Sequence, residues 1–291
     1  MSNTVQQKVS LPPFLKWAGG KSKLIQQYQD YFPKQGFKTY YEPFLGGGSI
    51  FFYLQPNSAI LTDINQELIE TYCCVRDNIE DLILLLEKHQ IKHNSDKSET
   101  HNYYYSVRES TCNTPLERAA RLIYLNKTCF NGLYRVNSKG KFNVPVGKYK
   151  NPKICNHDLL RSASVALKAA QIEVRLFEYI VDYAKTCDDF VYFDPPYYPV
   201  SQTSYFTAYS SDSFNEDNHR KLRDVFAQLA SRGVKVMLSN SDCPFIRQLY
   251  SDTEVFSCEN LPKMYEISAS RVINSDIKKR GKITELLITS Y

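Results

Sequence analysis

Residues 39–63 read TYYEPFLGGGSIFFYLQPNSAILTD, and this stretch decides the fold class. Its aromatic-rich start, residues 39–44, predicts a short buried strand that ends at three glycines. We predict a helix over residues 49–54 and a second strand over 59–62, closing on Asp63. Strand, glycine turn, helix, strand and acid is the order of a nucleotide-binding βαβ half.

The glycine turn and Asp63 together favour a cofactor that contains adenosine. Three glycines alone more often mark a flexible turn, although Gly46 and Gly48 would let the backbone approach a ligand and adopt positive φ. An acid at the end of the second strand is placed to hydrogen-bond the two hydroxyls of a ribose.

Strand–helix alternation returns in the last third of the chain and predicts an α/β fold with a mostly parallel sheet covered on both faces. The expected strands are residues 171–177, 190–193, 234–238 and 283–291, with a helix capped at 213–216 and ending near 232. Ligands of such sheets bind at the carboxyl ends of the strands, where the glycine turn, Asp63 and Asp194 are expected to converge.

Residues 66–155 lack this alternation, and we interpret them as an inserted, mainly helical domain. We expect residues 1–65 and 156–291 to form the catalytic, cofactor-binding domain. Within the insert we expect a helical stretch over 71–90, a polar loop over 93–102, a helix from a capping box at 114–117 to about 126, and a hairpin with turns at Asn131-Gly132 and Lys139-Gly140.

The formal net charge of +5 is modest, but residues 118–157 contain basic residues and no Asp or Glu. A charge run is usually a solvated surface. Here aromatic residues interleave with the cations, which favours nucleic acid, because cations neutralise phosphates and rings stack on bases. The aromatic residues are Tyr124, Phe130, Tyr134, Phe142 and Tyr149.

The strongest chemical motif is Asp194-Pro195-Pro196-Tyr197, directly after the apolar residues 189–193. Two prolines fix an extended turn and remove two N–H donors. The Asp194 carboxylate and the Pro195 carbonyl can then accept the two N–H groups of the adenine amine, while Tyr197 can stack on the base. The structural alternative is a proline-stiffened loop with a buried aspartate.

Other sequence features exclude competing classes of protein. Gly-Lys-Ser at 20–22 suggests a phosphate-binding P-loop, but Leu15 occupies the position of its first glycine. The cysteines form no C-x-x-C, so we expect reduced thiols and no metal. Polar residues 1–7 and a longest apolar run of residues 82–86 predict a cytoplasmic protein without membrane association.

The ordered motifs resemble the DNA adenine methylases of the Dam type, the α-ordered or D12 class of N6-adenine methyltransferases. The resemblance spans residues 14–291. It is carried by residues 14–21 (FLKWAGGK), 42–49 (EPFLGGGS), 63–65 (DIN), 131–135 (NGLYR), 142–145 (FNVP), 194–197 (DPPY) and 206–209 (FTAY).

This resemblance implies a Rossmann-like methyltransferase sheet that binds S-adenosylmethionine, with the insert as target-recognition domain. Trp17 and Lys21 would line the cofactor pocket with Phe44 and the glycine turn. Asp63 would hold the ribose, and Asp194 would also approach the amino-acid end of the cofactor.

The resemblance also implies the residues that contact DNA. Arg135 would read the first guanine of GATC, and a bidentate Arg–guanine contact gives that role a physical basis. Phe130-Asn131 would enter the base stack beside a flipped adenine; relatives often have Tyr at position 130, and Phe keeps the stacking but loses a hydroxyl. The remaining expected contacts are Lys16, Leu133, Pro145 and Tyr149, with Leu133 and Pro145 against a thymine methyl.

We therefore expect a monomeric, site-specific adenine DNA methyltransferase that flips its target base out of double-stranded DNA in a bacterial cytoplasm or nucleoid, or that is phage-encoded. Epigenetic marking and restriction–modification both remain open. The alternatives are methylation of cytosine N4 or of RNA adenine, and a catalytically silent DNA-binding protein. Asp at the first position of 194–197 favours adenine over cytosine N4, where Ser is more frequent.

Overall fold

The computed structural model describes residues 10–95, 100–200, 214–257, 261–270 and 282–291. The FTAY motif at 206–209 and the expected cap residue Ser213 lie outside the described residues.

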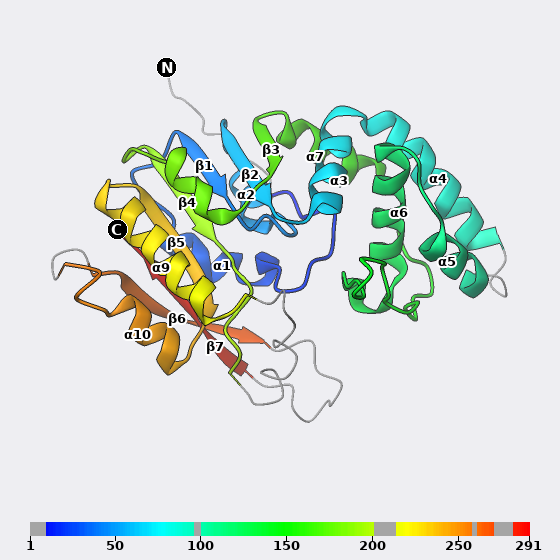
Figure 1. The fold of residues 1–291 in the computed structure, drawn as a ribbon. Helices are drawn as coiled ribbons and strands as arrows, with labels where there is room; N and C mark the ends of the chain where they lie inside the picture. Colours follow the sequence, from blue (N-terminus) through cyan, green and yellow to red (C-terminus); the bar gives the residue numbers. More distant parts are fainter. Residues whose placement is uncertain (1–9, 96–99, 201–213, 258–260, 271–281) are drawn as a thin grey trace, which may run out of the picture. The chain divides into compact units, whose positions relative to one another are not determined.

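Seven strands of the described chain form one mixed sheet in the order β3-β2-β1-β4-β5-β7-β6 (Figure 1). Parallel pairs join β1 to β2, β1 to β4 and β4 to β5, whereas β7 runs antiparallel to β5 and β6. The predicted α/β class is confirmed. The strands are β1 (Thr39–Glu42), β2 (Ala59–Asp63), β3 (Ala170–Val174), β4 (Asp189–Phe193), β5 (Lys235–Ser241), β6 (Lys263–Ser270) and β7 (Lys282–Thr289).

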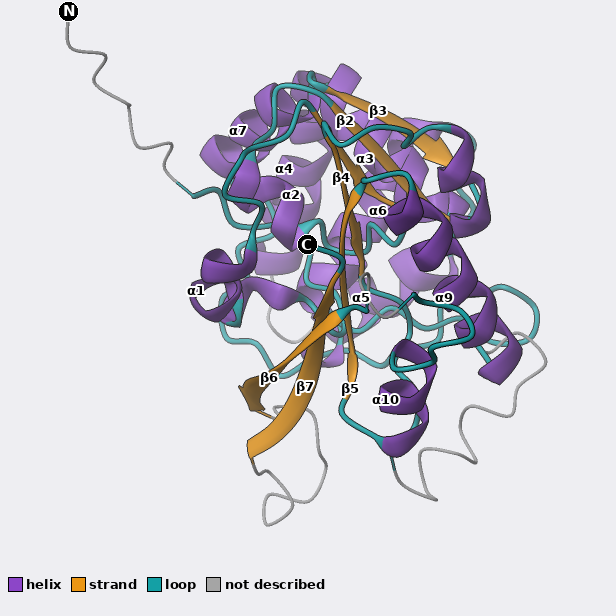
Figure 2. Cartoon of the chain, turned by 90° about the vertical axis from the view of Figure 1, so that its left-hand side faces the viewer, coloured by secondary structure: helices purple, strands orange, loops and turns teal. Residues whose placement is uncertain are grey.

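One compact unit comprises Leu24–Leu45, Asn57–Thr62 and Arg175–Tyr291. Its helices α9 (Glu216–Ser231) and α10 (Pro244–Tyr250) lie on one face of strands β5 to β7, and α1 (Ile25–Tyr28) lies on the other (Figure 2). Helix α9 begins within the stretch expected to cap it, but its cap is Asn215 and not Ser213: the Asn215 side chain accepts a hydrogen bond from the Asn218 amide. Apolar side chains of α9 and of the strands form the core of this unit.

The other unit comprises the chain up to Lys23, Gly46–Pro56 and Asp63–Val174. Its long helices pack against one another (Figure 1). The capping box of Thr114 and Glu117 is present as predicted at the start of α6. The expected division at residues 66–155 stays a prediction. The helices are α2 (Ser49–Leu54), α3 (Gln66–Asp77), α4 (Ile79–Ser95), α5 (Thr100–Glu109), α6 (Pro115–Thr128) and α7 (His157–Leu167).

The prediction of a polar loop over residues 93–102 was wrong at both ends. Helix α4 continues to Ser95, and α5 begins at Thr100. His93 is buried, and its Nδ1 lies 3.1 Å from the Tyr124 hydroxyl in a hydrogen bond. A polar residue therefore extends the helix here because a partner on α6 satisfies it. Helices α5, α7 and α10 and strand β6 were not predicted from the sequence.

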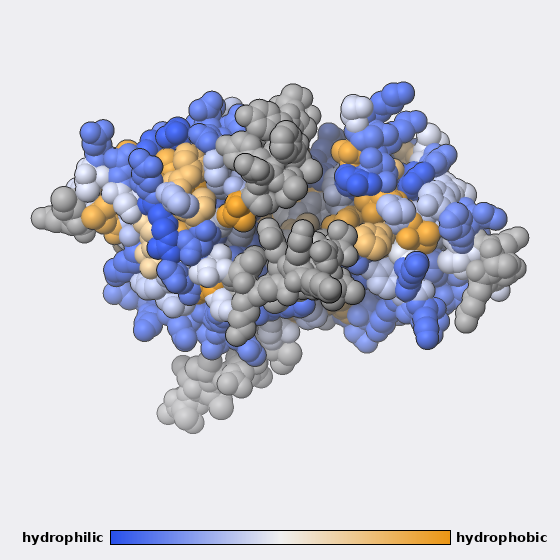
Figure 3. Space-filling model, turned by 90° about the horizontal axis from the view of Figure 1, so that it is seen from below, coloured by the Kyte–Doolittle hydropathy of each residue, from blue (hydrophilic) through white to orange (hydrophobic). Residues whose placement is uncertain are grey.

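Hydrophilic side chains dominate the face seen in Figure 3, and hydrophobic residues gather there in small patches. Within the described residues, no helix is long and apolar enough to span a membrane. The same part of the chain holds no cluster of His, Cys, Asp and Glu side chains suited to a metal ion.

Candidate active site

The glycine turn between β1 and α2 is shaped around Trp17. Gly46 has φ of 46° and Gly48 has φ of 64°, which is the left-handed region that favours glycine. A Cβ on Gly46 would lie 2.7 Å from Trp17 Cδ1, and one on Gly47 would lie 3.1 Å from Trp17 Cβ. The turn therefore admits the indole ring only because these positions carry no side chain.

Asp63 stands at the end of β2 and closes this turn. Its Oδ2 accepts a hydrogen bond from the Gly46 amide at 3.1 Å, and its Oδ1 accepts one from the Asn65 amide at 2.9 Å. Burial raises the pKa of Asp63, while these backbone amides lower it. Each carboxylate oxygen has a second lone pair, so an anchored Asp63 can still accept from a further hydroxyl.

The other two expected cofactor residues have different surroundings. The Lys21 side chain is buried, and its ammonium group donates to the Gly19 carbonyl at 2.5 Å. Phe44 stacks on Phe177 with ring centroids 5.3 Å apart and meets Phe214 edge to face at 5.7 Å. Phe44 thus belongs to an aromatic cluster of the sheet core.

Asp194 follows β4 directly, as the sequence predicts, and its carboxylate is held from the neighbouring strand. Its Oδ1 accepts a hydrogen bond from the Ser239 hydroxyl of β5 at 2.9 Å. That hydroxyl also lies 2.9 Å from the Tyr192 hydroxyl. One residue further along β5, Asn240 Oδ1 accepts the Tyr198 amide at 3.1 Å, which fixes the far end of the proline turn.

Tyr197 is anchored through its hydroxyl, which donates to Glu285 Oε2 on β7 at 2.7 Å. Burial, followed by the charges of Asp194 and Glu285, raises the pKa of Tyr197 well above its usual value. The hydroxyl is therefore a protonated donor at neutral pH. Of the two prolines, Pro195 is buried and Pro196 is exposed.

Phe130 and Asn131 form an exposed corner after α6, and the buried Gly132 follows them. Asn131 has φ of 55°, uncommon outside glycine, and Phe130 is 49% exposed. A Cβ on Gly132 would lie 2.5 Å from Lys16 Cδ, so the lysine stem packs directly on this glycine. The Lys16 ammonium group in turn lies 4.3 Å from the centre of the Tyr149 ring, a cation–π contact.

Arg135 lies on the predicted hairpin, whose arms meet at an antiparallel bridge between Val136 and Phe142. The guanidinium donates to Asn143 Oδ1 from Nε at 2.7 Å and to the Asn143 carbonyl from Nη2 at 3.1 Å. Arg135 is exposed. Of the expected thymine contacts, Leu133 is half-buried and Pro145 is exposed.

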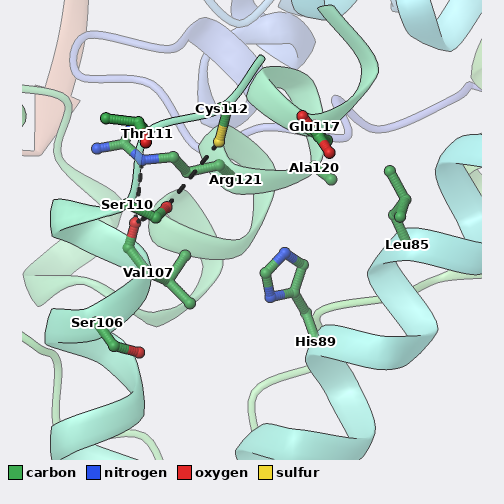
Figure 4. Close-up of a pocket in the computed structure, with 10 residues that line it drawn as sticks. All are labelled: Leu85, His89, Ser106, Val107, Ser110, Thr111, Cys112, Glu117, Ala120 and Arg121. Atoms are coloured by element: carbon green, nitrogen blue, oxygen red, sulfur yellow. Dashed lines mark hydrogen bonds between the residues drawn. The ribbon is translucent and has the colours of Figure 1, made fainter. Parts of the chain in front are cut away.

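A cavity of about 300 Å³ lies among helices α4, α5 and α6, with His89 pointing into it (Figure 4). Burial, followed by the charge of Lys92, lowers the pKa of His89 to about 4. None of the expected site residues lines this cavity. The Arg121 side chain at its edge donates to the carbonyls of Val107 and Arg108.

The residues that hold the proline turn, Ser239, Asn240 and Glu285, were not predicted from the sequence. Each lies far along the chain from Asp194, in strands whose polar residues carry no motif. The change in β5 from the apolar run of residues 236–238 to the polar Ser239 and Asn240 is a signal that could have drawn attention to them.

Comparison with known proteins identifies the family. A family model described as D12 class N6 adenine-specific DNA methyltransferase matches residues 17–267. The type II methyltransferase M1.LlaDCHI of Lactococcus lactis subsp. cremoris is 42% identical, with 98% of each chain covered. The type II methyltransferase M.MjaIII of Methanocaldococcus jannaschii is 40% identical over 97% of this chain and 100% of its own. The DNA adenine methylase of Escherichia coli strain K12 is 34% identical over 94% of this chain and 93% of its own.

Because the family match covers most of the chain and these relatives align over nearly their whole length, the chain belongs to the D12 class of N6 adenine-specific DNA methyltransferases.

Proposed function

We propose that this protein transfers a methyl group from S-adenosylmethionine to N6 of adenine in double-stranded DNA, at GATC, after flipping the adenine out of the helix. It acts as a monomer in a bacterial cytoplasm or nucleoid. The observation that carries the proposal is the acceptor turn at the end of β4, with Asp194 held by Ser239.

The residues around the glycine turn fit the cofactor. Trp17 offers a ring beside the turn, and Asp63 keeps acceptor capacity for the two ribose hydroxyls. Gly46 and Gly48 let the backbone approach closely, and Lys21 and Phe44 are further proposed contacts of the cofactor. When bound, S-adenosylmethionine supplies an electrophilic methyl group on its sulfonium.

The acceptor turn fits the adenine amine. The two N–H groups of that amine match the Asp194 carboxylate and the Pro195 carbonyl, which would orient the nitrogen lone pair toward the methyl donor. The Ser239 hydroxyl fixes the rotamer of Asp194, and the Glu285 carboxylate fixes the hydroxyl end of Tyr197. A ring held at one end is suited to stack on the flipped base.

The exposed corner and hairpin of the helical unit fit DNA. The exposed Phe130 and Asn131 would form the wedge into the base stack that offsets the cost of flipping a base, a few kcal/mol. Arg135 would read the first guanine, with apolar contacts from Leu133 and Pro145. Lys16 and Tyr149, already in contact with each other, would bind the adjacent DNA.

The decisive experiment treats GATC duplexes with enzyme and S-adenosylmethionine and identifies the methylated base by mass spectrometry. We expect N6-methyladenine, and product only on cytosine or only on RNA would refute the proposal. Asp194→Ala should abolish transfer while duplex binding, measured by fluorescence anisotropy, persists. Asp188→Ala is the matched control, because this exposed acid pairs with Lys38 just before the same strand. Activity surviving in Asp194→Ala would overturn the catalytic assignment.

A further inference from the structure

We infer that Tyr134 is a positioning residue that fixes Arg135 relative to the glycine turn. Base choice by Arg135 then depends on that turn, where the cofactor is proposed to bind. The inference rests on the proposed roles of Trp17 and Arg135. In this inference Tyr134 acts through Arg135 and is given no contact of its own with the cofactor or with a base.

The Tyr134 ring lies between two aromatic neighbours. It stacks on Trp17 with centroids 5.3 Å apart and an interplanar angle of 22°. On the hairpin side it meets the buried Phe142 ring at 5.9 Å and 69°. Trp17 is confined in turn by Gly46, where even a Cβ would clash with it. The ring of Tyr134 therefore connects the glycine turn to the hairpin.

The Tyr134 hydroxyl makes a second connection to the same turn. It donates to Glu67 Oε2 at 2.8 Å, and Glu67 lies in the first turn of α3. The cap residue of that helix, Asn65, donates its amide to Asp63. Burial, followed by the charge of Glu67, raises the pKa of Tyr134. The hydroxyl thus remains a donor, and the carboxylate it meets lies on the helix whose cap residue bonds the proposed ribose-binding acid.

The hairpin needs such a connection because it does not pack closely on α3. Hairpin residues 140–143 and Glu67 line one cavity of about 780 Å³. Arg135 follows Tyr134 directly, and its carbonyl accepts the Asn143 amide at 3.0 Å. Freeing Tyr134 would leave Arg135 attached to the hairpin but no longer fixed relative to the turn. A bidentate contact to guanine is sensitive to such a displacement.

The test compares kcat/KM for a GATC duplex and for a duplex with the first base pair changed. Tyr134→Leu removes the stack and the hydroxyl, and we expect the ratio of the two values to fall at least about fivefold, the lower end of typical coupling between sites. Tyr134→Phe keeps the stack but loses the hydroxyl, so its ratio should lie between those of Tyr134→Leu and the wild type. Glu67→Gln retains an acceptor for the Tyr134 hydroxyl, so its ratio should stay near the wild-type value. A purely structural loss would lower both rates together and leave the ratio unchanged.

Tyr103→Leu is the matched control. Tyr103 lies on α5 of the same unit, bonds His89 Nδ1 through its hydroxyl at 2.7 Å and packs on Tyr124. Its replacement should leave the ratio at the wild-type value. A fall in the ratio as large as that of Tyr134→Leu would show that base choice is not controlled through Tyr134 in particular and would overturn the inference.

A second readout uses the single tryptophan of the chain, Trp17, whose fluorescence reports the turn directly. S-adenosylmethionine is titrated with and without the GATC duplex, and by linkage the ratio of the two Kd values is the coupling between the sites. We expect that ratio to move toward one in Tyr134→Leu.

Arg135→Ala separates failure of the proposed function from failure of the present inference. If it leaves base choice unchanged, the proposed role of Arg135 fails. If it relaxes base choice while Tyr134→Leu changes neither ratio, only the present inference fails.

Discussion

The Ser239 hydroxyl donates a 2.9 Å hydrogen bond to the Asp194 carboxylate, joining the ends of two neighbouring parallel strands. The Asp194 carboxylate only accepts, so the Ser239 proton points to it, and the Tyr192 hydroxyl, 2.9 Å from Ser239 Oγ, is left as the donor of that second bond. The acceptor that we propose for the adenine amine is therefore held by side chains of β4 and β5, both fully buried.

Ser239→Ala should lower kcat by about tenfold or more while leaving the KM for DNA near its wild-type value. A hydrogen bond to a charged group contributes roughly 1.5–3 kcal/mol, and about 1.4 kcal/mol corresponds to tenfold in rate. Single-turnover methylation at saturating cofactor measures the change. Ser164→Ala is the control, since this buried serine donates to a neutral group, the Arg76 carbonyl. Wild-type kcat in Ser239→Ala would mean that Asp194 needs no such support.

The elements with local signals were predictable from the sequence. The βαβ order of residues 39–63 follows from aromatic strand residues, glycines and an acid, and helix α2 starts where it was predicted to start. The capping box at Thr114 fixes the start of α6 by contacts within four residues. Asp194 is likewise predictable, because an apolar strand precedes it and prolines follow it.

Elements that depend on distant partners were not predictable. His93 reads as a loop residue, yet it extends α4 because Tyr124 satisfies its ring nitrogen. Glu285 anchors Tyr197 only because β7 runs antiparallel to β5, a pairing that no local pattern specifies. Tyr134 reads as one more aromatic in a basic segment until its ring is found on Trp17.

Gly46→Ala should weaken S-adenosylmethionine binding at least about tenfold and change the emission of Trp17. Alanine at positive φ costs roughly 1–2 kcal/mol, and here its Cβ would also displace the indole ring. Gly36→Ala is the matched control, with φ of 73° and no atom within 4 Å of the added Cβ. Chemical denaturation should show a similar backbone cost in both variants, but only Gly46→Ala should lose cofactor affinity. Equal affinities would remove Trp17 from the pocket.

Arg135→Ala should relax choice at the first base pair of the site by roughly 1–3 kcal/mol. Competition between GATC and singly substituted duplexes measures that loss. Lys139→Ala, on the same exposed hairpin, provides the comparison: a lysine that meets only phosphate lowers affinity for every duplex alike and reduces the salt dependence of binding. An unchanged preference at the first base pair in Arg135→Ala would assign the reading of that base to another residue.

His219 should make the protein less stable as the pH falls from about 6.5 to about 4. Burial lowers the pKa of this histidine from 6.5 to about 4, against a smaller opposing effect of Glu216. Its Nδ1 accepts a hydrogen bond from Asn240 at 3.5 Å, and its Nε2 has no hydrogen-bond partner among the described residues. The folded state therefore favours the neutral form of the ring. Because the unfolded chain takes up the proton first, the contribution of His219 to stability is fully present above pH 6.5 and declines below it, by at most about 3 kcal/mol at pH 4.

His219→Gln cannot titrate but can still accept from Asn240, so its free energy of unfolding should depend less on pH across this window. His101→Gln, at an exposed position of α5, should keep the wild-type dependence, and identical pH profiles for all three proteins would contradict the assignment.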